Sequence, residues 1–297
     1  MSSLGEGPPW FAERSDGTVH YGAVPERLVY HPVLQERGIV LHRPIKPGVV
    51  FVTYNSHSSE AIAKDHVVKV LDLNTEELAI YERLLRDTNS SANHTLPCEI
   101  IRAGHPLLLM PFLDNIYTYL PALCRRRKLG PLLRAFHDLA EGVEYLHGKH
   151  IAHLDLCVGN VVVAGPRTAA FHETVIPHRV YIIDYDTAKQ FALGPGHQHA
   201  IVLPETQVTP PHGLVEFDPY SWDIYCLGRL FQWMTQCYYR GHGPPSRVAQ
   251  WFATWLVGDE RGCSGVCRCR PTARTVRRVL DVLIWVAPLI DRLGGFR

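Results

Sequence analysis

Three polar residues in the middle of the chain constrain its fold more than any other feature. Asp155 and Asn160 lie five residues apart, shortly after a segment whose apolar residues follow helical spacing. A second aspartate, Asp184, ends the next β-rich run, which begins at Val180. Residues of these types at these positions can place a base and two Mg²⁺ ligands around one phosphate. The sequence therefore predicts a helix, a polar loop and strands that support such a site.

Composition limits the classes of protein that this chain can belong to. Its 297 residues suffice for two modest lobes or one large domain. The formal net charge of +1 gives no electrostatic footprint for nucleic acid or an anionic membrane. The longest apolar run, Val279 to Ile290, is too short to span a bilayer. We expect no secretory signal, because the first residues show no basic segment followed by an apolar core. We expect an intracellular, cytoplasmic protein with no nucleic-acid or membrane partner; a nuclear location and the oligomeric state stay open.

The N-terminal part of the chain is punctuated by turns and rich in β patterns. Residues 1–35 contain many Pro and Gly residues and predict an irregular extension, packed on a domain surface or partly disordered. A helix is expected from Asn74, because a capping residue precedes acidic residues and helically spaced apolar positions. Five predicted strands accompany it: Ile39–Leu41, Val49–Tyr54, His66–Leu71, Glu99–Ile101 and Leu107–Met110.

After Leu113 the pattern becomes mainly helical. An amphipathic helix is expected at Leu132–His147, and two short strands are expected at Asn160–Ala164 and Val180–Ile183. A Pro-, Gly- and His-rich connection follows from Leu193 to Phe217, and such length inside a domain is typical of functional segments. Three more helices are predicted, at Tyr220–Cys237, Ser246–Val257 and Thr272–Leu293.

The order of several short motifs gives a family resemblance. The motifs are Val67-Val68-Lys69, His153-Leu154-Asp155 with Asn160, Ile183-Asp184-Tyr185-Asp186, Asp223–Gly228 and Arg270-Pro271-Thr272. In this order they resemble the eukaryotic protein kinase family over roughly residues 38–290, as a divergent, fungal-type protein kinase-like domain. The resemblance implies an α+β, bilobal protein-kinase-like fold. Its N-lobe (36–113) would have five antiparallel strands and one helix, and its C-lobe (114–297) would be mainly α-helical. One catalytic domain, 36–293, would follow the extension 1–35, whose role stays open.

The resemblance also implies roles for individual residues in binding ATP and Mg²⁺. Lys69 would bind the α- and β-phosphates and Glu77 would orient it, with Glu76 as the alternative partner. Asp155 would accept or orient the substrate hydroxyl, while Asn160 and Asp184 would hold Mg²⁺.

Further positions match the nucleotide site and its supports. Gly48 is the one glycine retained in the phosphate loop, Met110 would lie at the back of the adenine pocket, and Leu113 would offer hinge backbone groups. Asp223 would pin the backbone of the loop that contains Asp155. His153 is expected to pack and to form hydrogen bonds rather than to catalyse.

The chain departs from the family pattern at several points. Two prolines, Pro44 and Pro47, stiffen the phosphate loop, which predicts weak ATP affinity. Leu154 replaces the arginine that clamps a phosphorylated residue, so activity should not depend on phosphorylation of threonines in the 187–209 segment. Asp186 replaces a glycine, at a cost of about 1 kcal/mol where the backbone needs a left-handed conformation. His212 stands where the family has a glutamate that pairs with a late arginine, here Arg270, for which a surface position is the alternative.

Three functions follow from these motifs and departures. The first is an ATP-dependent protein kinase, of serine/threonine type by default, that transfers the γ-phosphoryl group to a protein hydroxyl. The second is a pseudokinase that acts as a binding or scaffolding module. The third is a small-molecule phosphotransferase of the aminoglycoside or choline kinase kind, which shares the spacing of Asp155 and Asn160. The motifs at Asp223 and Arg270 argue against this third function.

The eight cysteines favour reduced thiols in a reducing compartment. Only Cys263, Cys267 and Cys269 are clustered, within seven residues. Three thiols can bind zinc with a fourth ligand from elsewhere, although the spacing is unusual. The sequence leaves open whether they bind a metal or form a loop of free thiols.

Overall fold

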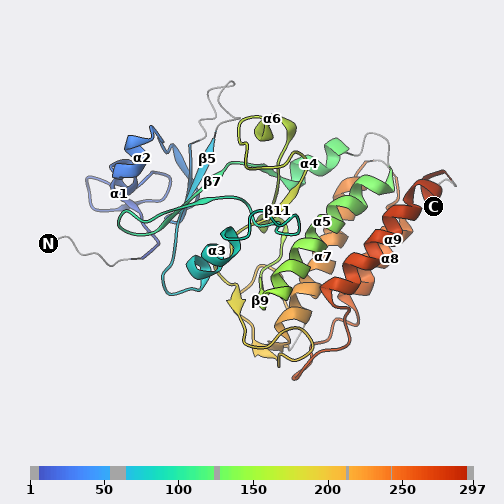
Figure 1. The fold of residues 1–297 in the computed structure, drawn as a ribbon. Coiled ribbons are helices and arrows are strands. Elements are labelled where there is room, and N and C mark those ends of the chain that lie inside the picture. The colour runs from blue at the N-terminus through green and yellow to red at the C-terminus, as the bar shows by residue number, and fades with distance from the viewer. Residues whose placement is uncertain (1–6, 54–64, 124–127, 212–213, 242, 293–297) are drawn as a thin grey trace. The chain divides into compact units, whose positions relative to one another are not determined.

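The computed structural model describes residues 7–53, 65–123, 128–211, 214–241 and 243–292, which form a mixed α+β protein with antiparallel sheets and helices (Figure 1). The chain divides into two compact units. The first unit contains residues 1–78, 96–113 and 164–177. The second contains residues 79–95, 114–163 and 178–297. Each unit thus collects segments that are distant in sequence.

The first unit is built around a five-stranded sheet in the order β3-β4-β5-β7-β6, and all neighbouring strands are antiparallel. The strands are rich in Val, Ile and Leu, which pack well on a pleated surface. The predicted five-stranded antiparallel sheet is therefore present. Its strands are β3 (Arg43–Lys46), β4 (Val50–Val52), β5 (His66–Val70), β6 (Glu99–Ile101) and β7 (Leu107–Pro111).

The first strand of this sheet lies later in the sequence than predicted. Ile39 and Leu41 pack against the core but belong to no strand, and β3 begins only at Arg43, which pairs with Val52. The apolar pattern at Ile39–Leu41 reflects packing against the core and not pairing with another strand. Residues that the sequence assigns to a phosphate loop are thus mostly strand, and the connection is a turn at 47–49. Tyr54 and the predicted turn at 55–59 lie outside the described residues.

The N-terminal segment closes one face of the sheet. Trp10, Leu28 and Leu34 are buried in the same hydrophobic cluster as the strand residues Val68 and Val70. Burying a large apolar side chain contributes about 1.5–3 kcal/mol. The segment from residue 7 to 36 is therefore part of the core of the first unit. Its elements are the strand pair β1 (Ala12–Glu13) and β2 (Val19–His20) and the helices α1 (Glu26–Val29) and α2 (Pro32–Glu36).

The second unit is dominated by helices that pack in pairs. Helix α5 (Leu129–Gly148) packs against α9 (Ala273–Arg292), and α7 (Pro219–Tyr239) packs against α8 (Arg247–Val257). Gly228 permits the second contact, because a Cβ atom there would lie 2.8 Å from the backbone nitrogen of Val257. All four helices overlap the helices predicted from sequence. Helix α4 (Ile116–Leu123) also packs against α7.

Short strands in the second unit position the candidate residues. Strands β8 (Asp114–Asn115), β10 (Val161–Val163) and β11 (Val180–Ile182) form a three-stranded antiparallel sheet. Two further pairs are β9 (Ile151–Ala152) with β12 (Lys189–Gln190), and β13 (Ile201–Val202) with β14 (Glu216–Phe217). The remaining elements are α3 (Glu77–Leu85), the short helix η3 (Val158–Asn160) and α6 (Pro166–Ala169).

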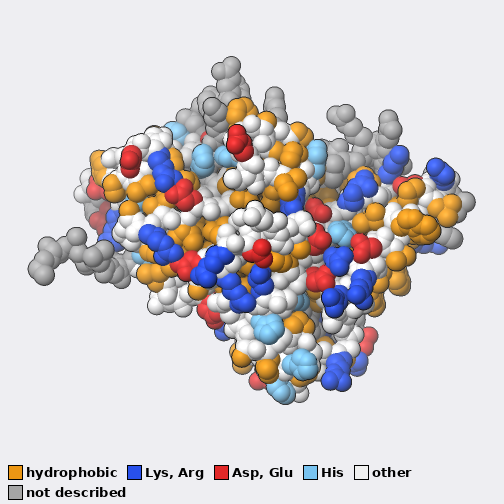
Figure 2. Space-filling view, in the orientation of Figure 1, with side chains coloured by type: hydrophobic (Ala, Val, Ile, Leu, Met, Phe, Trp, Pro, Cys, Tyr) orange, Lys and Arg blue, Asp and Glu red, His pale blue; other side chains and the backbone are white. Residues whose placement is uncertain are grey.

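Within the described ranges, no helix has the length and apolar character that crossing a membrane requires. Figure 2 shows acidic and basic side chains interspersed on the visible face, as the small net charge leads one to expect.

Candidate functional site

The first group of predicted residues centres on Lys69 in β5. Side chains alternate between the two faces of a strand, and the neighbours Val68 and Val70 face the hydrophobic cluster, so Lys69 points to the opposite face. There it is paired across the sheet with Val50 and Leu108. Its exposed fraction is 3%, which excludes a lysine that extends into water.

Glu77 is the partner of this lysine. The Lys69 Nζ lies 2.6 Å from the Glu77 Oε1, and the exposed fraction of Glu77 is 0%. The predicted pairing with Glu77 is confirmed by this contact. When a lysine and a carboxylate are buried together, their mutual attraction offsets the free-energy cost of removing both charges from water.

The position of Glu77 follows from the local sequence. It is the first residue of α3, and its backbone N–H donates to the Thr75 Oγ1 at 3.3 Å. The Thr75 hydroxyl in turn donates to the Asp72 carbonyl at 2.9 Å. A carboxylate in the first turn also interacts favourably with the helix dipole. Thr75, rather than the predicted Asn74, therefore bonds the first amide of the helix.

Gly48 lies in the turn between β3 and β4 with a φ of 74°, a left-handed conformation that favours glycine. A Cβ atom there would lie 2.7 Å from the Cβ of Pro9, and the Trp10 backbone N–H donates to the Gly48 carbonyl at 2.8 Å. The turn is thus packed against the N-terminal segment. In this structure the glycine is required by its conformation and by that packing.

Met110 and Leu113 are both buried in the first unit. Met110 in β7 pairs with Val67, which shares a sheet face with Lys69. Leu113 is the last residue of its segment in the first unit. Both positions are compatible with the predicted roles, which remain predictions.

The second group centres on Asp155 and Asn160, which are buried and in direct contact. The Asn160 Nδ2 donates to the Asp155 carbonyl at 2.8 Å and to the Asp155 Oδ2 at 3.1 Å. Because the amide nitrogen is used in this way, the Oδ1 is the Asn160 atom suited to a cation. The Ile183 backbone N–H donates to the Asn160 carbonyl at 3.0 Å, which places the chain leading into Asp184 beside Asn160.

Asp223 fixes the backbone of this loop, as predicted. Its carboxylate accepts hydrogen bonds from the backbone N–H groups of His153 at 2.9 Å and Leu154 at 2.8 Å. The His147 Nε2 lies 2.9 Å from the same carboxylate. Asp223 is fully buried in the first turns of α7, and that helix begins where the Asp218 carboxylate accepts from two backbone N–H groups. His153 takes part in hydrogen bonding, as the sequence predicts, since its Nε2 lies 3.0 Å from the Ile183 carbonyl oxygen.

Two residues of this group have a left-handed backbone. Leu154 and Asp184 each have a φ of 66°. Such conformations cost free energy in residues other than glycine and tend to cluster at functional sites. Asp186 is not among the described residues with positive φ, so the cost of a left-handed conformation does not arise at this position. The left-handed conformation falls on Asp184, two residues earlier.

The residue after Asp184 anchors the segment. Tyr185 is fully buried, and its hydroxyl lies 3.0 Å from the Thr95 Oγ1. Its ring packs edge-on against Tyr81, with 5.1 Å between the centroids. The Tyr81 hydroxyl accepts a long hydrogen bond, 3.4 Å, from the Asp184 backbone N–H. Tyrosine therefore provides both the packing ring that the sequence analysis expects and a hydrogen bond.

Gln207 is a contact of Asp155 that the sequence does not indicate. Its backbone N–H donates to the Asp155 Oδ1 at 2.7 Å, and its side-chain Nε2 donates to the Oδ2 at 2.9 Å. Both oxygens of the carboxylate are thus engaged by one residue of the long 193–217 connection. The length of that connection is the only signal in the sequence that points to this contact.

Cys157 and Arg270 are both buried in the second unit. Burial, with a contribution from the charge of Asp155, raises the pKa of the Cys157 thiol to about 11. Arg270 is buried rather than on the surface, and it donates to the carbonyl groups of Val257 at 3.0 Å and Arg261 at 2.8 Å. The surface alternative for Arg270 is wrong, because backbone carbonyls satisfy the guanidinium inside the unit. His212 lies outside the described residues.

No protein-family model matches this chain, and no curated protein matches it. The site therefore has to be interpreted from its own chemistry. The first unit holds a buried lysine–glutamate pair, and the second holds an aspartate, an amide and a further aspartate around one loop. The second group supplies oxygen atoms suited to a hard cation and a carboxylate suited to hydrogen bonding with a hydroxyl.

Proposed function

We propose that the chain is an ATP-dependent protein kinase, of serine/threonine type, with the bilobal fold of that family. The observation that carries the proposal is the loop of the second unit, where Asn160 bonds Asp155 and the chain entering Asp184 bonds Asn160. A base and two Mg²⁺ ligands are the groups that phosphoryl transfer to a hydroxyl requires. The hydrogen bonds that Asp223 accepts from the backbone of His153 and Leu154 hold that loop in place.

Each residue then has a separate role. Asp155 would accept the proton of the substrate hydroxyl as the hydroxyl oxygen attacks the γ-phosphorus of ATP. The bond between the γ-phosphorus and the bridging oxygen breaks, and ADP leaves. Asn160, through its Oδ1, and Asp184, through its carboxylate, would hold Mg²⁺, and their oxygen donors fit that hard cation. When bound, Mg²⁺ neutralises charge on the phosphates. Lys69, held by Glu77, would bind the α- and β-phosphates of ATP.

Two further properties follow for the proposed kinase. Leu154 offers no cation to a phosphorylated residue, so the activity should not depend on phosphorylation of Thr187, Thr206 or Thr209. The turn at Gly48 is packed against Pro9 and contains no run of glycines, so ATP affinity should be weak. Alanine at all three threonines should leave turnover unchanged, and abolished turnover would contradict the first expectation.

One observation favours a second candidate, a pseudokinase that binds partners without catalysis. Gln207 donates to both oxygens of the Asp155 carboxylate, and Asn160 also donates to its Oδ2, so three of about four accepting sites are occupied. The kinase proposal requires that a substrate hydroxyl reaches the remaining site or displaces Gln207. The pseudokinase candidate requires that Gln207 stays in place and keeps such a hydroxyl out.

The discriminating experiment measures transfer of radiolabelled phosphate from γ-labelled ATP to a generic protein substrate in the presence of Mg²⁺. Wild type is compared with Asp155→Ala and Lys69→Met, and Asp281→Ala serves as an acidic control far along the chain on α9. Label with wild type and the control, and none with the two site variants, supports the kinase. Absence of label from all four proteins contradicts it and supports the pseudokinase.

A further inference from the structure

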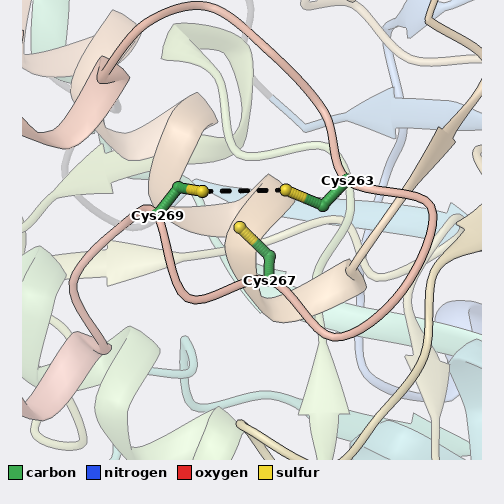
Figure 3. Close-up of side chains that lie close together, drawn as sticks. All are labelled: Cys263, Cys267 and Cys269. Atoms are coloured by element: carbon green, nitrogen blue, oxygen red, sulfur yellow. Dashed lines mark hydrogen bonds between the residues drawn. The ribbon is translucent and has the colours of Figure 1, made fainter.

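The connection between α8 and α9 brings three thiols together. Figure 3 shows the side chains of Cys263, Cys267 and Cys269 pointing toward one another from a single loop. Their sulfur atoms all lie within 4.8 Å of one another, and all three residues are half-buried or exposed. Other cysteines of the described chain, such as Cys226 and Cys237 in α7, are buried and lie outside this group.

The spacing of the sulfur atoms matches a metal site. Zinc–sulfur bonds of about 2.3 Å in a tetrahedral arrangement place neighbouring sulfurs about 3.8 Å apart. The Cys263 and Cys269 Sγ atoms are separated by 3.8 Å. A disulfide requires about 2.05 Å, so the thiols lie at the separation of two ligands of one ion.

Hydrogen-bond donors surround the sulfur atoms, as second-shell groups do in metal sites. The Ser221 hydroxyl lies 3.1 Å from the Cys267 Sγ. The Arg261 Nη2 lies 3.7 Å from the Cys269 Sγ. Such donors stabilise the negative charge that three thiolates leave on a bound divalent ion.

We propose that Cys263, Cys267 and Cys269 bind one zinc ion as thiolates. As the three Zn–S bonds form, the three thiol protons pass to solvent. Among the described residues no fourth His, Cys, Asp or Glu joins the group, so the fourth ligand comes from outside it. The proposal is independent of the proposed kinase activity.

The proposed zinc site would stabilise the N-terminal end of α7. The Cys267 backbone N–H donates to the Asp218 Oδ2 at 3.0 Å, while the Asp218 Oδ1 accepts from the backbone N–H groups of Tyr220 and Ser221. The same helix carries Asp223, five residues further on. Zinc in the loop therefore fixes the helix start from which the Asp155 loop is held.

The experiment measures zinc per chain by elemental mass spectrometry after dialysis of the reduced, full-length protein. Wild type is compared with Cys267→Ser, with the triple serine variant of the cluster and with Cys98→Ser, which removes a half-buried thiol outside the cluster. We expect one zinc per chain in wild type and in Cys98→Ser, and near none in the cluster variants. Equal zinc in all four proteins, or none in wild type, overturns the proposal.

A second measurement needs no variant. Zinc is removed from wild type with a chelator and replaced by Co²⁺, whose spectrum reports its ligands. We expect the thiolate-to-cobalt charge-transfer band in the near ultraviolet together with the visible bands of a tetrahedral ion. A spectrum without the charge-transfer band excludes thiolate ligands and contradicts the proposal, even if the cluster variants fail to fold.

Discussion

The two groups of candidate residues are built in different ways. Lys69 and Glu77 are eight residues apart and form a buried ion pair. Asp155, in contrast, depends on Asp223 and Gln207, which lie 68 and 52 residues further along the chain. One group is a local pair and the other is a network assembled by the tertiary structure. Substitutions should therefore separate function from stability in the first unit more easily than in the second.

The largest effect is expected at the centre of the network. Asp223→Ala removes the acceptor of the His153 and Leu154 backbone N–H groups, and it leaves these donors buried without a partner. The free energy of unfolding should fall by about 3–6 kcal/mol. Urea denaturation followed by circular dichroism measures the change. Asp281→Ala, which removes a half-exposed carboxylate, should change stability by less than about 0.5 kcal/mol. Similar losses of unfolding free energy in the two variants would show that the hydrogen bonds to Asp223 do not stabilise the loop.

The next effect tests the local pair. Lys69→Met leaves the buried Glu77 carboxylate without its lysine and should cost about 3–5 kcal/mol. Adding Glu77→Gln removes the remaining charge and should restore most of the stability, while phosphoryl transfer stays absent. Thermal unfolding and the labelling assay are measured on both variants. Recovery of transfer in the double variant would show that the pair has only a structural role.

A smaller effect concerns the contact between the long connection and Asp155. Gln207→Ala removes one hydrogen bond to a charged group and should cost about 1–2 kcal/mol of stability. For the proposed kinase, phosphoryl transfer should not fall and should rise if the contact limits access to Asp155. Gln198→Ala is the control, because the Gln198 side chain donates to the carbonyl of its neighbour His199. A loss of transfer specific to Gln207→Ala would show that Gln207 assists catalysis instead.

The smallest expected effect is on the reactivity of the Cys157 thiol. Because its pKa is raised to about 11, about one Cys157 thiol in a thousand is ionised at pH 8, and alkylation should be slow. Asp155→Asn removes the neighbouring charge, so alkylation of Cys157 should become faster. Peptide mass spectrometry after timed iodoacetamide treatment measures the rate. An unchanged rate would mean that burial alone protects the thiol.

The same contrast explains what the sequence reveals. The Lys69–Glu77 pair is predictable because a strand and a helix start are both marked locally. Asp223 is predictable because a short motif marks its helix. Gln207 is not, since no local pattern in a long irregular connection specifies which residue meets a carboxylate 52 positions away. Tertiary contacts of this kind are decided by packing, which a single sequence does not display.

One wrong prediction and one open alternative have a similar origin. The apolar pattern at Ile39–Leu41 predicts a strand, but these residues pack against the hydrophobic cluster without a partner strand. For the N-terminal extension the sequence leaves open packing on a domain surface or partial disorder, and in the structure Trp10 and Leu28 are buried in the core of the first unit. A pattern of apolar residues indicates that a segment is buried, but it does not indicate which other segment covers it.

We propose that Asp184 holds a magnesium-bound nucleotide. Calorimetric titration of wild type with ATP, with and without Mg²⁺, tests this role, with Asp184→Asn as the site variant and Asp186→Asn as the matched control. We predict weak binding that requires Mg²⁺ in wild type and in the control, and no binding in Asp184→Asn. Absence of binding in wild type, or equal binding in all three proteins, would contradict the claim.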